Sequence, residues 1–151
     1  HFTLIIAANI LTFALMARIL SVDYGTKRCG IAVTDPLQII VSGLDTVHTN
    51  DLLDFIKKYC EEEEVEEFVV GYPMHMDGTP AQMASHVIGF TRKLEKLFPE
   101  KAVTLHDERF SSEDAKQVIL NSGTKKKKRR DKALVDKVSA VLILQDYLGH
   151  L

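Results

Sequence analysis

Residues 17–35 read ARILSVDYGTKRCGIAVTD and contain two β-rich runs separated by a tight turn. The first run, Arg18 to Val22, is followed by the turn signal Tyr24-Gly25, and the second extends from Gly30 to Thr34. Strands joined by so short a connection pair as an antiparallel hairpin. The stretch therefore predicts the start of a sheet and leaves one carboxylate, Asp23, at the carboxyl end of its first strand.

Downstream of this hairpin, the hydrophobic pattern alternates between strand and helix periods. We expect a third strand within Ile39 to Val47 and a helix capped by Asn50 or Asp51. The later elements are a strand at 68–70, a helix from Thr79 to about Leu97, a strand at 102–105, a helix from Ser111 to about Asn121 and a helix from Asp131 to about Leu148. This order predicts an α/β fold with a mixed five-stranded sheet, three antiparallel strands followed by βα units, and helices on both faces.

Composition indicates one soluble globular domain, because 151 residues can bury a single core but not two ordinary ones. The net charge of −2 conceals a dipolar distribution, with six glutamates between Glu61 and Glu67 and an unbroken basic run from Lys125 to Arg130. Two cysteines, Cys29 and Cys60, suit a reducing compartment and make neither a disulfide framework nor a zinc site.

The first fifteen residues carry no full charge, and Met16 follows them directly. They lack the basic region and cleavage site of a signal peptide and are shorter than the roughly 20 apolar residues of a membrane span. We interpret residues 1–15 as a non-native leader and 16–151 as the folded domain. A short membrane anchor is the alternative.

Three carboxylates are candidates for catalysis. Asp23 ends the first strand, and Glu108 follows the last strand, which can lie beside the first; Asp136 shares a helix face with apolar residues such as Ala140. An acid on an apolar face loses solvation unless a cation compensates. Structural explanations stay open for each: a turn that bonds its own backbone, a surface ion pair, or a side chain that reaches solvent.

Together these acids make a hard oxygen-ligand site suited to Mg²⁺ or Mn²⁺, which supports phosphodiester hydrolysis of the two-metal type. Basic residues near each acid suit a nucleic-acid backbone, although the basic run is equally compatible with a solvated loop. A Gly/Pro-rich loop before the second helix offers free amides for a phosphate, or only turn chemistry. The candidate substrate-binding residues are Lys27, Arg28, Thr79, Arg109, Lys126, Lys127, Arg129 and Arg130.

Four ordered segments resemble the YqgF/RuvX family, whose members are described as Holliday junction resolvases and as nucleases of the 16S rRNA precursor. They are 17–35, 69–84 (VVGYPMHMDGTPAQMA), 106–115 (HDERFSSEDA) and 135–148 (VDKVSAVLILQDYL). The resemblance spans about Met16 to Leu148. It implies an RNase H-like fold, a cytoplasmic bacterial enzyme, and catalytic and metal-binding roles for Asp23, Glu108 and Asp136.

We therefore expect a nuclease that acts on structured RNA or branched DNA, with no membrane partner and as a monomer or weak dimer. Two other classes remain. The Asp23-Tyr24-Gly25-Thr26 turn also fits the phosphate loop of actin-like ATPases, although those proteins clamp ATP between two domains. A non-catalytic nucleic-acid-binding factor of ribosome assembly would explain the basic run, but it gains nothing from carboxylates beside phosphates.

Overall fold

The computed structural model describes residues 16–74, 81–108, 117–118 and 131–151. Its strands are β1 (Arg18–Asp23), β2 (Arg28–Thr34), β3 (Val41–His48), β4 (Val65–Pro73) and β5 (Ala102–Glu108). Its helices are the 3₁₀ turn η1 (Thr49–Asp51) and the α-helices α2 (Leu52–Glu62), α3 (Ala84–Leu97) and α6 (Lys132–Tyr147). The strands, the first helix and the last helix thus lie where the hydrophobic pattern predicted them.

The five strands form one mixed sheet in the order β3-β2-β1-β4-β5. β1, β2 and β3 pair antiparallel, whereas β1, β4 and β5 run parallel, so the carboxyl ends of these three strands meet at one edge. Our expectation that the last strand lies beside the first was wrong. β4 separates them, because β5 pairs along the free side of β4 from Glu67 to Pro73.

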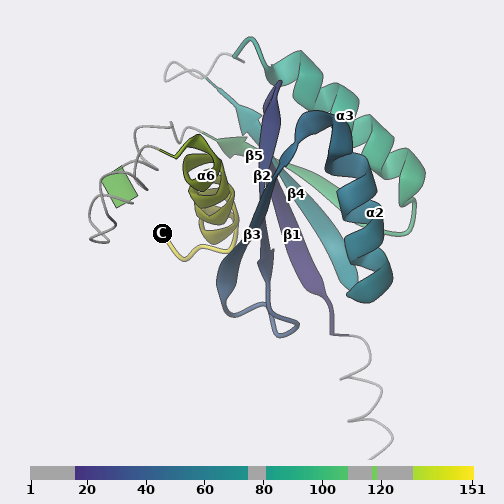
Figure 1. The fold of residues 1–151 in the computed structure, drawn as a ribbon. Coiled ribbons are helices and arrows are strands. Elements are labelled where there is room, and N and C mark those ends of the chain that lie inside the picture. The colour runs from purple at the N-terminus through teal and green to yellow at the C-terminus, as the bar shows by residue number, and fades with distance from the viewer. Residues whose placement is uncertain (1–15, 75–80, 109–116, 119–130) are drawn as a thin grey trace, which may run out of the picture.

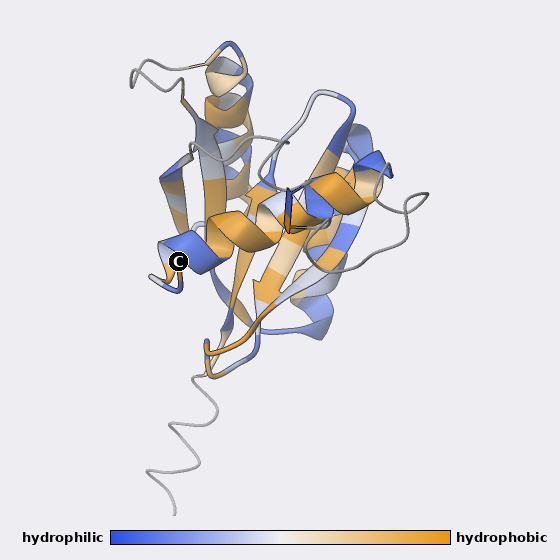
Figure 2. Ribbon diagram, turned by 90° about the vertical axis from the view of Figure 1, so that its left-hand side faces the viewer, coloured by the Kyte–Doolittle hydropathy of each residue, from blue (hydrophilic) through white to orange (hydrophobic). Residues whose placement is uncertain are grey.

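The helices cover both faces of the sheet, as predicted (Figure 1). One face packs against α2 and α3 through a large core that includes Leu20, Ile56, Phe68 and Leu94. The other face packs against α6 through a smaller core that includes Ile143. Figure 2 looks onto α6 and shows it hydrophobic along much of its length. No helix among the described residues is long and apolar enough to cross a bilayer.

The second helix begins later than its sequence signals suggested. α3 starts at Ala84 rather than near Thr79, and Met83 precedes it without a side-chain cap. The amide of Ala81 instead donates to the carbonyl of Pro73 at 3.0 Å, which ties this segment to the end of β4. Thr79 itself lies outside the described residues. So does most of the helix expected from Ser111, of which residues 117 and 118 are described and helical.

Two hydroxyl groups fasten α6 to the sheet. Ser21 of β1 is fully buried and donates to the carbonyl of Ala140 at 2.8 Å, and Thr46 of β3 donates to the carbonyl of Ala133 at 2.6 Å. Asp131 caps the helix by accepting from the amide of Ala133. These bonds tie α6 to β1 and β3 on either side of Asp136 along the helix, and so fix where Asp136 lies.

We expect Ser21→Ala to lower the free energy of unfolding by about 1 kcal/mol, because a buried hydrogen bond to a helix carbonyl is lost. Urea denaturation monitored by circular dichroism measures the change. Ser42→Ala, at an exposed position of β3, is the matched control and should change it by less than about 0.5 kcal/mol. An equal response of the two variants would mean that the Ser21 hydroxyl does not stabilise the docking of α6.

Candidate active site

The backbone of α6 lies close to the sheet at Asp136, and a glycine makes this approach possible. Gly30 of β2 lies directly opposite Asp23 of β1 in the antiparallel pair. A Cβ built on Gly30 would lie only 1.9 Å from the carbonyl oxygen of Asp136. Only a residue without a side chain fits there. Because directly opposite residues share a face of the sheet, Asp23 faces α6 beside Asp136.

The pKa values of both carboxylates are raised in the folded protein. Burial, with the charge of Asp136 as a second cause, raises the pKa of Asp23 from 3.8 to about 7. Burial also raises the pKa of Asp136, against the opposing effect of Arg28. Near neutral pH the pair therefore carries an unfavourable charge that a bound cation would relieve. Such a pair at the carboxyl edge of a parallel sheet is typical of a functional site rather than of a stabilising contact.

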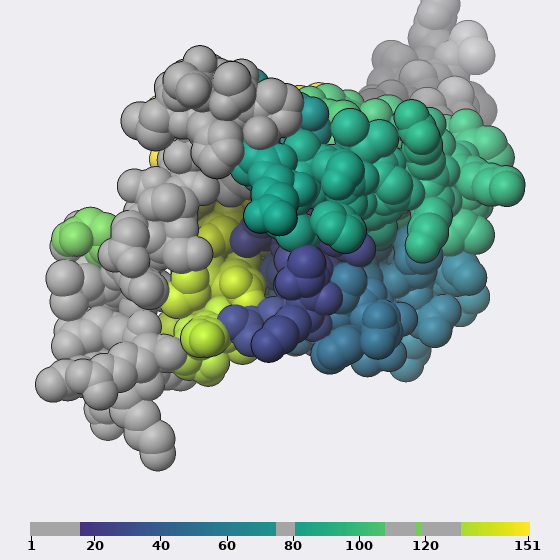
Figure 3. All heavy atoms as spheres, turned by 90° about the horizontal axis from the view of Figure 1, so that it is seen from above, coloured from purple at the N-terminus to yellow at the C-terminus, as the bar shows by residue number. Residues whose placement is uncertain are grey.

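Two of the basic residues predicted to bind substrate lie at the same edge. The Nε atom of Arg28 contacts Oδ2 of Asp136 at 2.5 Å, so its guanidinium pairs with an acid instead of standing free. Lys27 is exposed in the preceding turn. Figure 3 shows the purple turn after β1 between the yellow-green start of α6 and the teal α3. Arg28 thus has a second role, holding Asp136, that the sequence did not suggest.

The third predicted acid, Glu108, is placed only by its backbone. It ends β5 and pairs with Pro73, so it lies at the same sheet edge as Asp23 but two strands away. Adjacent strands are about 4.8 Å apart, which leaves its backbone roughly 10 Å from that of β1. The remaining candidates lie outside the described residues: Thr79, Arg109, Lys126, Lys127, Arg129 and Arg130.

The donor set fits a divalent cation with oxygen ligands. Asp23 and Asp136 provide carboxylate oxygens, the ligands that Mg²⁺ and Mn²⁺ prefer. Among the side chains that the structure describes, no group of three or more His, Cys, Asp or Glu residues could hold a metal. The described part of the site is therefore a pair of ligands. Glu108 is the candidate third ligand only because its backbone ends β5 at the same edge of the sheet. Its side chain is not described.

Gly30 brings the two acids together, a role that its place at the start of a predicted strand does not reveal. An isolated glycine among Cys29, Ile31 and Ala32 is nevertheless a signal for close backbone approach. The anchoring role of Ser21 has a weaker signal, a polar residue inside an apolar strand. Both cysteines are free thiols, as predicted.

Comparison with known proteins gives a consistent result. The RuvX family, described as Holliday junction resolvase, matches residues 17–150. A protein of Christiangramia forsetii named "Putative pre-16S rRNA nuclease" is 53% identical over 133 residues, covering 88% of this chain and 98% of the relative. A protein of Porphyromonas gingivalis with the same name is 53% identical over 135 residues, covering 89% and 98%.

Solved structures are more distant. YeaZ from Pseudomonas aeruginosa aligns with a TM-score of 0.42 and 18% identity, covering 72% of this chain and 50% of that one. This likeness is too weak to support a conclusion. The sequence relatives are close enough to decide the family.

Proposed function

The chain belongs to the RuvX family of Holliday junction resolvases, and from this membership we propose that it is a metal-dependent nuclease that hydrolyses phosphodiester bonds in nucleic acid. The observation that carries the proposal is the meeting of Asp23 and Asp136 at the carboxyl edge of the sheet, opposite Gly30. Burial and the charge of Asp136 make the ionised form of Asp23 unfavourable. A cation shared by the two acids explains this arrangement better than a contribution to folding does.

The substrate we propose first is the precursor of 16S rRNA, because the relatives from Christiangramia forsetii and Porphyromonas gingivalis are named for it. A branched DNA junction is the second candidate, from the family description. A nuclease of ribosomal RNA precursors acts where ribosomes assemble, so we also propose a cytoplasmic location. A purely binding function is not favoured, since the partly buried carboxylates of Asp23 and Asp136 repel the phosphates that such a protein must hold.

In the proposed mechanism, of the two-metal type, Asp23, Asp136 and Glu108 would hold Mg²⁺ or Mn²⁺. Bound there, the metal would supply Lewis acidity, which would favour ionisation of the attacking water and neutralise charge on the phosphate. Arg28 keeps the carboxylate of Asp136 oriented through their 2.5 Å contact. Lys27, exposed in the turn beside Asp23, attracts the nucleic-acid backbone, and Thr79, Arg109, Lys126, Lys127, Arg129 and Arg130 are proposed to do the same.

The decisive experiment measures cleavage of labelled precursor-like structured RNA and of a four-way DNA junction with Mg²⁺, Mn²⁺ or EDTA. We expect metal-dependent cleavage of at least one substrate, faster on RNA, and none in EDTA. Asp136→Asn, purified identically, should lower the rate at least about 100-fold and so exclude a contaminating nuclease. Failure of every substrate with both ions, or equal cleavage by Asp136→Asn, would contradict the proposal.

A further inference from the structure

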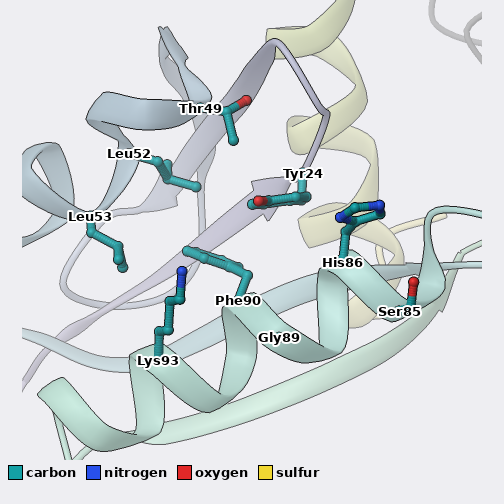
Figure 4. Close-up of a pocket in the computed structure, with 9 residues that line it drawn as sticks. All are labelled: Tyr24, Thr49, Leu52, Leu53, Ser85, His86, Gly89, Phe90 and Lys93. Carbon is teal, nitrogen blue, oxygen red and sulfur yellow. The ribbon is translucent and has the colours of Figure 1, made fainter.

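A pocket of about 280 Å³ opens on the opposite face of β1 from the acid pair. Side chains alternate along a strand, so Asp23 faces α6 while the next residue, Tyr24, faces α2 and α3. Consecutive Cα atoms are about 3.8 Å apart, so the pocket begins one residue from the candidate catalytic acid. Figure 4 shows its walls: Tyr24, the beginning of α2, and one side of α3.

The interior of the pocket is aromatic and apolar. The ring of Tyr24 stacks on that of Phe90, with centroids 5.0 Å apart and planes inclined by 28°. Leu52 and Leu53 of α2 complete the apolar lining. Phe90 is buried in the core, whereas Tyr24 is only partly buried. A flat aromatic surface that is rigidly supported from behind and partly exposed is a stacking platform for another planar ring.

The rim of the pocket is polar and has cationic character. Lys93 and His86 extend from α3 on either side of Phe90, and Ser85 lies one turn before Gly89 (Figure 4). Thr49 adds a hydroxyl that is itself held by the carbonyl of Gly25 at 2.7 Å. None of the nine lining residues is acidic. This combination of an aromatic floor and a basic rim matches a base with its attached phosphate.

A glycine in the middle of α3 lines the pocket without adding a side chain to it. Gly89 is the one lining residue without a side chain, and a Cβ built there meets nothing within 4 Å. Packing therefore does not require a glycine at this position, and glycine is among the least favourable residues in a helix interior. What its small size provides is space. Gly30 is the contrasting case, since there a Cβ would collide with backbone.

We propose that this pocket receives one unpaired nucleobase of the nucleic-acid substrate, stacked on Tyr24, while the neighbouring phosphate lies at the acid pair. The inference rests on the proposed nuclease function for its substrate class. A volume of about 280 Å³ is near the lower limit of small-ligand sites, roughly 300 Å³, and so suits a single base better than a larger group. A paired base would first have to leave its stack, so the pocket favours sites with unpaired nucleotides.

The proposal is tested with variants whose added side chains fill the pocket. Fluorescence anisotropy measures how strongly each variant binds single-stranded and double-stranded RNA. EDTA prevents cleavage, so that binding alone is observed. Gly89→Leu places a side chain in the open space, whereas Gly89→Ala makes a similar change in helix propensity with much less volume. We expect Gly89→Leu to weaken binding of a short single strand about tenfold, the loss of roughly one stacked base, and Gly89→Ala to weaken it less than threefold. Binding of a blunt duplex should change by less than about twofold, because its bases do not enter the pocket.

A second variant shows whether the loss of binding comes from filling the pocket or from the change at Gly89 alone. Ser85→Leu fills the pocket from the preceding helical turn and should reproduce the loss for single strands. Thermal unfolding shows whether each variant is folded. Unchanged single-strand affinity in folded Gly89→Leu and Ser85→Leu, or an equal loss for duplex, overturns the inference. Cleavage by the wild type is measured separately. If the wild type does not cleave but the two variants lose single-strand binding, the proposed nuclease function is refuted and the proposed base-binding pocket is kept.

Discussion

Replacing Asp23 by Asn is expected to lower metal-dependent cleavage at least about 1,000-fold while leaving the protein folded. Carboxylate-held ions contribute several kcal/mol to the stabilisation of a phosphoryl transition state, and each 1.4 kcal/mol corresponds to a factor of ten in rate. Asn has nearly the same shape but is a much weaker ligand. Initial rates on the best substrate, measured at saturating Mg²⁺ or Mn²⁺, check this expectation.

The same substitution should make the metal-free protein more stable at alkaline pH. The pKa of Asp23 is 3.8 ordinarily and about 7 in the folded protein. Between these values the folded state holds a proton that the unfolded state has released, so wild-type stability falls as pH rises from about 4 to about 7. Asn cannot ionise. We therefore expect Asp23→Asn to exceed the wild type by a few kcal/mol at pH 8 in EDTA, and by much less at pH 4.

The effect of metal on stability shows whether Asp23 is a metal ligand or only a residue whose charge destabilises the fold. Mg²⁺ or Mn²⁺ should raise the melting temperature of the wild type at pH 8 and have little effect on Asp23→Asn, because ions that bind only the folded state stabilise it. Asp54→Asn, at an exposed position of α2 on the opposite face of the sheet, is the control and should behave like the wild type. Equal stabilisation of all three proteins by metal would show that Asp23 is not a ligand.

The parts of the fold that the sequence predicted well are those governed by local patterns. The hairpin of β1 and β2 follows from two β-rich runs around Tyr24-Gly25, and α6 follows from its cap at Asp131 and its long apolar face. Strand order is different. The local sequence around residues 102–105 does not predict which strand they pair with. The structure places β4 between β5 and β1.

The start of α3 shows how a tertiary contact overrides a local signal. Thr79-Pro80 and Gln82 make a strong cap pattern, yet α3 begins at Ala84. The hydrogen bond from the amide of Ala81 to the carbonyl of Pro73 occupies an amide inside this pattern and links it to β4. Capping is worth roughly 1 kcal/mol, which a few packing contacts can exceed.

The acid pair was predicted in part. Asp136 on an apolar helix face indicated a desolvated carboxylate, and its raised pKa agrees with that interpretation. Its proximity to Asp23 depends on the height of α6 over the sheet, which no periodicity encodes. That height is limited by Gly30, whose missing side chain is visible in the sequence but whose contact, the carbonyl of Asp136, lies about a hundred residues away.

Gly30→Ala is therefore expected to disturb both stability and cleavage. The added Cβ would lie 1.9 Å from the carbonyl oxygen of Asp136 and 2.9 Å from the amide nitrogen of Lys137, and neither backbone atom can rotate away. To reach ordinary contact, α6 must move outward by roughly 1 Å or more. Overpacking of this kind costs about 1–3 kcal/mol. The move also strains the bonds of Ser21 and Thr46 to the helix. Urea denaturation measures the loss.

The effect on cleavage should be larger than the loss of stability suggests. A displacement of about 1 Å at a catalytic group can lower the rate roughly 100-fold, and here it would separate Asp136 from Asp23 in a protein that is still folded. Gly89→Ala is the matched control for stability, because its Cβ meets open space and helix propensity should make that variant up to about 1 kcal/mol more stable. Ser42→Ala, at an exposed position of β3, is the control for cleavage. If Gly30→Ala unfolds like Gly89→Ala and cleaves like Ser42→Ala, the close approach of α6 to β2 is not what assembles the site.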